Sequence, residues 1–115
     1  MQRRFPQESD VYYYWALAAL GGCRPAFHAG ETIDGVARLL REAVRLDPRS
    51  ARAGALLALV VEDYFVLRHL PLPPFCASRP GVPSRLDAAD AREIVDHVPA
   101  TDCATWRVIN HRSGQ

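Results

Sequence analysis

The sequence contains no lysine, and all fourteen of its strongly basic residues are arginine. A Schiff-base enzyme and a lysine-dependent nucleotide-binding loop are therefore excluded. The frequent use of arginine, alanine and proline is typical of a high-GC bacterial genome. The formal net charge is +1, so the overall charge gives no reason to expect nucleic acid or an anionic membrane as a partner.

Cysteine and long apolar runs are also scarce. The three cysteines, at 23, 76 and 103, are too few and too far apart for the disulfide framework of a small secreted protein. The longest apolar run, 53–61, has nine residues, whereas a membrane span needs about twenty. No apolar signal segment follows the polar first ten residues. We therefore expect a soluble, reduced, cytoplasmic protein with no membrane partner.

No metal-binding or catalytic motif is present. Zinc ligands usually come in pairs at short spacing, and no such pair occurs among the three cysteines and four histidines. Cys23 and His28 share one loop, but a cysteine nucleophile also needs an orienting side chain that the sequence does not identify. We expect no catalytic residue, no metal and no cofactor. A small cysteine-dependent enzyme or thiol sensor stays open as an alternative.

The stretch 50–70 contains no proline and organises the rest of the chain. Its leucine, valine and aromatic residues are too many and too close together to share one stripe of a helix. A helix that is apolar all round is normally buried with neighbours on several sides. The stretch therefore predicts a central buried helix, capped by Ser50 and ended by Pro71.

Two helices are expected before this central one. Asp10 can cap a helix that ends at the Gly21-Gly22 pair, and Thr32 can cap a second that ends before Asp47-Pro48. The second has a one-sided apolar pattern at positions 33, 36, 37, 40, 43 and 44. Asp34 and Arg38 lie four residues apart on its other side and should form an ion pair.

After a proline-rich linker at 71–83, a helix should begin at Ser84 or Asp87 and stop at Pro99. The remainder, 100–115, is either a short helix capped by Thr101 or Asp102 or an edge strand, and we favour the helix. The predicted architecture is an all-α fold of four to five helices. Residues 1–9 form a tail, and 10–115 form a single domain.

The segment 36–64 resembles tetratricopeptide repeats. Val36, Leu40, Ala43 and Pro48 stand at the spacing of the second helix of such a repeat, and the Leu57-Ala58 pair fits the first helix of the next. The resemblance extends over roughly 11–70, about one and a half repeats. It implies helical hairpins and protein–protein binding, with no chemistry.

Two surfaces are candidates for binding. Aromatic residues at consecutive positions of one helix cannot all be buried, and such residues are enriched at protein interfaces. These interface candidates are Tyr12, Tyr13, Tyr14 and Trp15. An arginine row could hold an acidic peptide or phosphate, or could simply be a solvated helix face. This row comprises Arg38, Arg41, Arg45, Arg49 and Arg52.

A third feature is the Glu62-Asp63 pair inside the most apolar helix, which is either a site or a buried carboxylate pair bound by arginine. Taken together, the sequence predicts a protein–protein interaction module, an adaptor or accessory subunit that can also self-associate. Its partner is another protein. Phosphate or nucleic-acid binding through the Arg38, Arg41 and Arg45 face is the alternative, and the low net charge argues against it.

Overall fold

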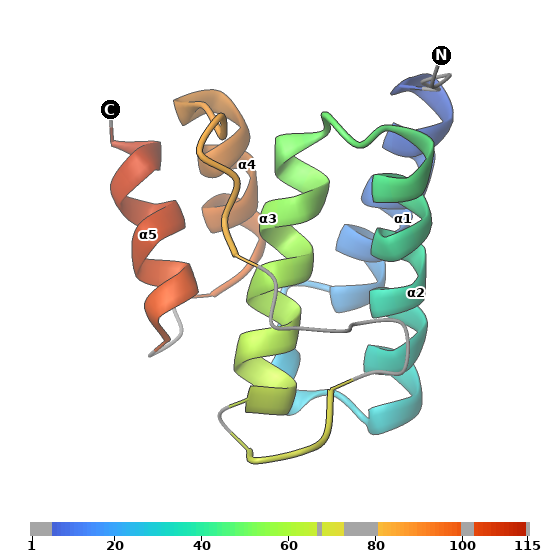
Figure 1. Cartoon of the computed structure of the whole chain (residues 1–115). Helices are drawn as coiled ribbons and strands as arrows, with labels where there is room; N and C mark the ends of the chain where they lie inside the picture. The colour runs from blue at the N-terminus through green and yellow to red at the C-terminus, as the bar shows by residue number, and fades with distance from the viewer. Residues whose placement is uncertain (1–5, 67, 73–80, 100–102, 115) are drawn as a thin grey trace.

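The computed structural model of the chain describes residues 6–66, 68–72, 81–99 and 103–114. In this part of the chain every regular element is a helix and no strand occurs, which confirms the predicted all-α fold. Five α-helices are joined by two short segments of other helix types (Figure 1). The elements in chain order are α1 (Pro6–Leu20), η1 (Pro25–Phe27), α2 (Gly30–Leu46), α3 (Ala51–Val60), η2 (Val61–Val66), α4 (Ala88–His97) and α5 (Ala104–Ser113).

The helices α1 and α2 form an antiparallel hairpin. α2 buries the apolar stripe that the sequence predicted, including Ile33, Leu40 and Ala43. The buried Ser9 hydroxyl donates a hydrogen bond to the Ala43 carbonyl at 2.8 Å. This bond places Ser9 of α1 at the same height along the hairpin as Ala43 of α2. The i,i+4 pair of Asp34 and Arg38 is also present, at 3.0 Å.

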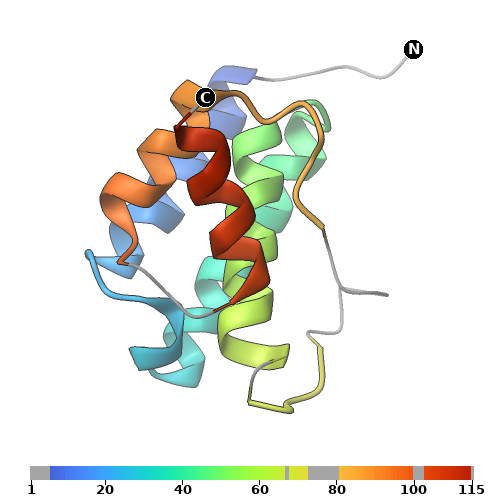
Figure 2. The same cartoon turned by 90° about the vertical axis from the view of Figure 1, so that its left-hand side faces the viewer.

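Helix α3 and the π-helical segment η2 run through the middle of the molecule, between the α1/α2 hairpin and the α4/α5 pair (Figures 1 and 2). Eight of the ten residues of α3 are buried, which confirms the predicted central buried helix, although the helical structure ends at Val66 and not at Pro71 as predicted. Ser50 caps it as predicted, accepting the Ala53 N–H at 3.4 Å. In η2 four consecutive residues, Val61 to Tyr64, are buried, so this turn is packed on all sides.

Helices α4 and α5 form the second antiparallel pair. Asp87 caps α4 and accepts the Asp90 N–H at 2.8 Å, one of the two starts that the sequence allowed. Ile94 of α4 and Ile109 of α5 are fully buried in the common core. The C-terminal segment is helical, as favoured, but its cap is Cys103, whose sulfur accepts the Trp106 N–H.

Several predicted boundaries were wrong. The first helix begins at Pro6, not at Asp10, so residues 6–9 of the predicted tail belong to α1. Proline is well suited to the first position of a helix, because the missing N–H would have no partner there. The second helix begins at Gly30, after Ala29, and Thr32 is not its cap. Most of the predicted linker, at 73–80, and the proposed caps Thr101 and Asp102 lie outside the described residues.

Candidate functional site

The four consecutive aromatic residues of α1 point to different surroundings. Tyr13 is buried and Tyr12 is half-buried, whereas the side chains of Tyr14 and Trp15 keep 45% and 60% of their surface exposed. Tyr12 and Trp15 stack with ring centroids 6.4 Å apart, on the side of α1 that adjoins α2. Tyr14 lies on the α4 side and donates a hydrogen bond to Glu93 at 2.9 Å. The sequence correctly predicted partial exposure, and the exposed rings fall on two faces.

Tyr12 and Trp15 line an apolar groove on the outside of the α1/α2 hairpin. Its main hollow has a volume of about 510 Å³, with Ala19, Gly35 and Leu39 among its other walls. A neighbouring hollow of about 470 Å³ shares the same two aromatic residues and continues toward the start of α1. We call these two hollows together the outer groove. It is lined by Glu8, Val11, Tyr12, Trp15, Ala19, Glu31, Thr32, Gly35, Val36, Arg38, Leu39, Glu42, Arg45 and Leu46.

The outer groove exists because α1 has more apolar surface than its neighbours cover. From Val11 to Leu20, α1 is apolar around its whole circumference, whereas α2 has a single apolar stripe that is already buried. Val11, with 63% of its surface exposed, and Trp15 are the large apolar residues of α1 left on the outside. A helix of this kind is normally covered on all sides, so its outer side has the composition of an interface.

The arginine row is only partly a continuous surface. Arg38 is paired with Asp34, and Arg45 forms an ion pair with Glu42. The hydrogen bonds that Arg45 donates to Glu42 lower the pKa of the Glu42 carboxyl. Arg41 is exposed on the same helix, and Arg49 is exposed in the turn that follows. Two of the three α2 arginines therefore already have carboxylate partners, and both of these pairs lie at the edge of the outer groove.

Arg52 does not belong to this row. It lies at the junction of α1, α3 and α4, where it pairs with Asp10 at 2.5 Å and with Glu93 at 3.3 Å. It also donates to the Tyr14 hydroxyl at 2.7 Å and stacks over the rings of Tyr13 and Tyr14. Burial acts against its charge, but the hydrogen bonds to Asp10 and Tyr14 outweigh this and raise the pKa of Arg52. Its surroundings make it a structural residue.

Glu62 and Asp63 are both buried, with 2% and 1% of their surface exposed. Asp63 accepts hydrogen bonds from Arg24 at 2.6 and 3.3 Å and from the Ala26 N–H at 2.9 Å. Glu62 accepts the Thr105 N–H at 2.7 Å, in the first turn of α5. These bonds attach η2 to the η1 loop and to α5. The arginine partner that the sequence predicted for these carboxylates is present, although Arg24 lies in a loop and not on a helix. The contacts of Glu62 and Asp63 are those of residues that hold the fold together.

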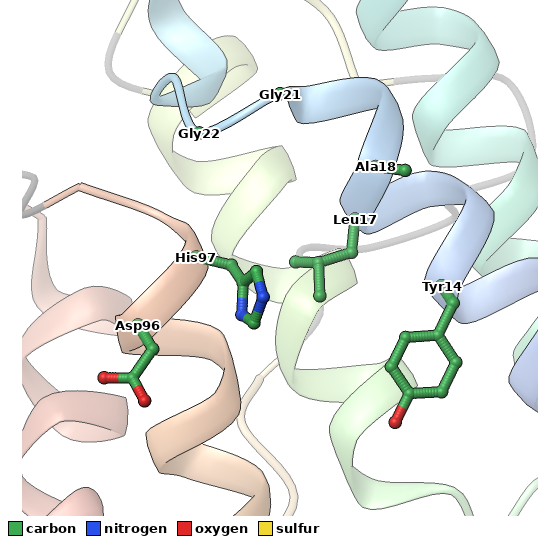
Figure 3. A pocket seen from close by; sticks show the side chains of 7 residues that line it. All are labelled: Tyr14, Leu17, Ala18, Gly21, Gly22, Asp96 and His97. Carbon is green, nitrogen blue, oxygen red and sulfur yellow. The ribbon is translucent and has the colours of Figure 1, made fainter.

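A third hollow, of about 450 Å³, lies between α1 and the end of α4 (Figure 3). Its walls include Tyr14, Leu17, Asp96 and His97. His97 Nδ1 donates to the Glu93 carbonyl at 2.8 Å, which leaves Nε2 as the ring nitrogen without an assigned partner within the described chain. One imidazole and one exposed carboxylate over an apolar floor do not identify a ligand. The sequence reasoning did not single out this hollow, because its sides are about eighty residues apart.

The two described cysteines lie in different surroundings. Cys23 is exposed at the end of α1, and Cys103 is buried as the cap of α5. Cys76 lies outside the described residues. His28 contacts the Leu20 carbonyl at 2.8 Å. Where the structure describes the chain, no group of three or more His, Cys, Asp and Glu side chains could hold a metal ion.

Comparisons with known proteins add no further assignment. No protein-family model, no curated protein and no solved structure matches the chain. Within the described ranges, none of the helices has the length and apolar character that crossing a membrane requires.

Proposed function

We propose that this chain is a protein–protein interaction module, without catalytic activity of its own, that binds an apolar segment of a protein chain in the outer groove. The observation that carries the proposal is that Val11 and Trp15 are exposed next to half-buried Tyr12 and Leu39 on one continuous surface. Exposed tryptophan and tyrosine beside a hollow are typical of the residues that dominate binding energy at protein interfaces.

The shape of the groove favours an amphipathic helix as the bound segment. The groove follows two antiparallel helices along most of their length, from Glu8 and Arg45 at one end to Ala19 and Glu31 at the other. A helix lying in such a groove would place apolar residues three or four positions apart onto Trp15 and Leu39. The charged residues along the edges would face the polar sides of the bound helix.

The resemblance to tetratricopeptide repeats is part of the same proposal. α1, α2 and α3 follow one another as antiparallel neighbours, and the turn between α2 and α3 is short, as that resemblance implies. The connection between α1 and α2, residues 21–29, is longer than the tight turn of such repeats. We propose the chain as an adaptor or accessory subunit on this basis, and the interaction class does not depend on the family.

A differential capture experiment tests the proposal. The intact chain, a Trp15→Ser variant and a Val108→Ser variant are each immobilised and exposed to a lysate of the source organism. Val108 is an exposed apolar residue on α5, away from the outer groove, and serves as the matched control. Proteins captured by the wild type and by Val108→Ser but lost with Trp15→Ser are identified, and their binding is then measured with purified components.

The expected result is a protein whose affinity falls at least tenfold with Trp15→Ser and stays within twofold with Val108→Ser, since one buried tryptophan commonly contributes about 2 kcal/mol or more to an interface. Capture that is equally strong for both variants would assign binding to another surface. A captured protein that responds instead to Arg41→Glu, with steep loss of binding in salt, would favour the anionic-ligand alternative.

A further inference from the structure

We propose that the outer groove packs against the outer groove of a second copy of this chain, so that the protein forms a twofold-symmetric dimer. This inference rests on the proposed function, because it uses the same docking surface and names its occupant. A twofold interface brings one surface patch onto itself, so the patch must be complementary to itself in shape and in charge.

The shape of the outer groove meets this condition. It carries one large projecting side chain, Trp15, and beside it a wall of small residues, Ala19 and Gly35. A methyl group added at Gly35 would have no atom within 4 Å, so the space over this residue is open. The projecting indole of one copy therefore has an open recess to occupy in the other, and each copy supplies both parts.

The charges of the outer groove also meet the condition that the patch be complementary to itself. The exposed Glu8 is the acidic residue that α1 contributes to the groove, and Arg45 on α2 lies at the same end of the hairpin. Their common level follows from the hydrogen bond between Ser9 and Ala43. With a twofold axis parallel to the helices, α1 of each copy lies along α2 of the other at the same level. Glu8 of one copy then faces Arg45 of the other, twice in each dimer.

The composition of α1 supplies the third argument. From Val11 to Leu20 this helix is apolar around its whole circumference, and within the monomer only part of that surface is covered. The apolar surface of α1 that stays exposed in the monomer is buried best against a surface of the same composition, and the second copy presents one. The two hairpins would pack as a four-helix bundle, an arrangement that buries apolar stripes of this kind without further elements.

The experiment is a measurement of molar mass in solution across a concentration series, by sedimentation equilibrium and by light scattering behind a sizing column. The wild type is expected to convert from monomer to dimer as concentration rises. Gly35→Leu should weaken the dimer about tenfold or more, because leucine fills the recess that Trp15 of the other copy needs. The open space at Gly35 and the helix preference of leucine keep the monomer folded.

Two variants serve as controls. Gly35→Ala adds a single methyl group and should leave the dissociation constant within about threefold. Ala89→Leu places the same leucine side chain at an exposed position of α4, outside the groove, and should leave the dissociation constant unchanged. Circular dichroism and thermal unfolding at low concentration establish that each variant is folded before its association is compared.

A charge exchange tests the orientation. Glu8→Arg and Arg45→Glu should each weaken the dimer by about three- to tenfold, since each places like charges opposite one another. The double variant, with both changes in the same chain, should regain the wild-type dissociation constant within about twofold. Failure of the double variant to recover would overturn the orientation with its axis parallel to the helices.

A monomer at every concentration would overturn the second copy as the occupant. So would a dimer that is insensitive to both Gly35→Leu and Trp15→Ser, because it would use another surface. Neither result decides whether the groove binds a different protein, which the capture experiment with Trp15→Ser measures separately. The two experiments therefore distinguish failure of the dimer from failure of the proposed function.

Discussion

Arg24 and Asp63 form a two-pronged ion pair, with Arg24 Nη2 at 2.6 Å and Nε at 3.3 Å from the two carboxylate oxygens of Asp63. The carboxylate is fully buried, and the guanidinium keeps a quarter of its surface in solvent. Asp63 belongs to η2 and Arg24 to the loop that follows α1, so the pair ties the end of the central helix to the end of the first hairpin helix. A buried carboxylate needs such partners, because desolvation without them is costly.

The first prediction concerns this pair. Arg24→Ala removes the charged partner of the buried Asp63 carboxylate and leaves it the Ala26 N–H as a hydrogen-bond donor, and we expect a loss of about 3 kcal/mol in the free energy of unfolding. Urea unfolding measures it. The matched control is Arg38→Ala, which breaks an exposed pair with Asp34 and should cost about 0.5 kcal/mol or less. Equal losses for the two variants would contradict the structural role of Asp63.

The second prediction concerns Arg52 and Glu93. Because the same guanidinium also holds Asp10 and Tyr14, Arg52→Ala should destabilise the fold more than Glu93→Ala. A double-mutant cycle between the two positions should give a coupling energy of about 1 kcal/mol, since this pair is partly buried. The cycle is measured by urea unfolding at low and high salt. Additive losses would show that the 3.3 Å contact contributes nothing to stability.

The third prediction uses two glycines inside helices as a matched pair. Gly35 on α2 has open space around it, so Gly35→Ala should stabilise the monomer by about 0.5–1 kcal/mol through helix propensity. At Gly54 on α3, a methyl group would come within 3.0 Å of Pro83. Gly54→Ala should therefore be at least about 1 kcal/mol less stable than Gly35→Ala. Thermal unfolding compares the two, and equal gains would contradict the packing of Pro83 on α3.

The fourth prediction concerns the thiols. Cys23 is exposed and Cys103 is buried as a helix cap, so in a Cys76→Ser background one thiol should react with a mild disulfide reagent at once. The second should react only as fast as the protein unfolds. The reaction is followed by absorbance in water and in urea. A fast reaction of Cys103 would contradict its burial, and an unusually fast Cys23 relative to a free thiol would revive the thiol-sensor alternative.

Local sequence patterns were enough to predict the helical core. The apolar residues on all sides of α3 and the one-sided stripe of α2 depend on helix periodicity alone, and both were correct. The start of α2 was not predictable in this way, because Gly30 lies against Tyr64, a residue of η2, with the hydroxyl 3.1 Å from where a methyl group would stand. The start of α1 at Pro6 does have a local signal, because proline is favoured in the first turn of a helix. The prediction of a start at Asp10 did not take this preference into account.

The candidate site was only half predictable for the same reason. Helix geometry required that part of the Tyr12 to Trp15 cluster be exposed, and the structure bears this out. Which rings are exposed depends on where α2 and α4 pack, and α4 is distant from α1 in sequence. Spacing placed Arg52 in a row with the α2 arginines, whereas the turn between α2 and α3 redirects it toward Asp10 and Glu93.

The last prediction follows from the absence of lysine and from the burial of Tyr13. Burial raises the pKa of the Tyr13 hydroxyl well above its ordinary value of 10.0, and the nearby Glu93 carboxylate raises it further. The unfolded chain then loses this proton at a lower pH than the folded chain does. Stability is complete below about pH 10 and falls as pH rises above it, by up to about 1.4 kcal/mol per pH unit for this one group.

Because the chain has no lysine, the other side chains that change charge in or near the range from pH 9 to 11 are the cysteines and the three remaining tyrosines, of which Tyr14 also has a raised pKa. Unfolding in urea at a series of pH values measures the fall in stability. Tyr13→Phe should flatten it, because phenylalanine keeps the ring under Arg52 and carries no proton to lose. Tyr12→Phe, at a half-buried neighbour in the same helix, is the control. If both variants lose stability with pH as steeply as the wild type, the alkaline transition does not come from Tyr13, and its burial in the α1/α4 junction is wrong.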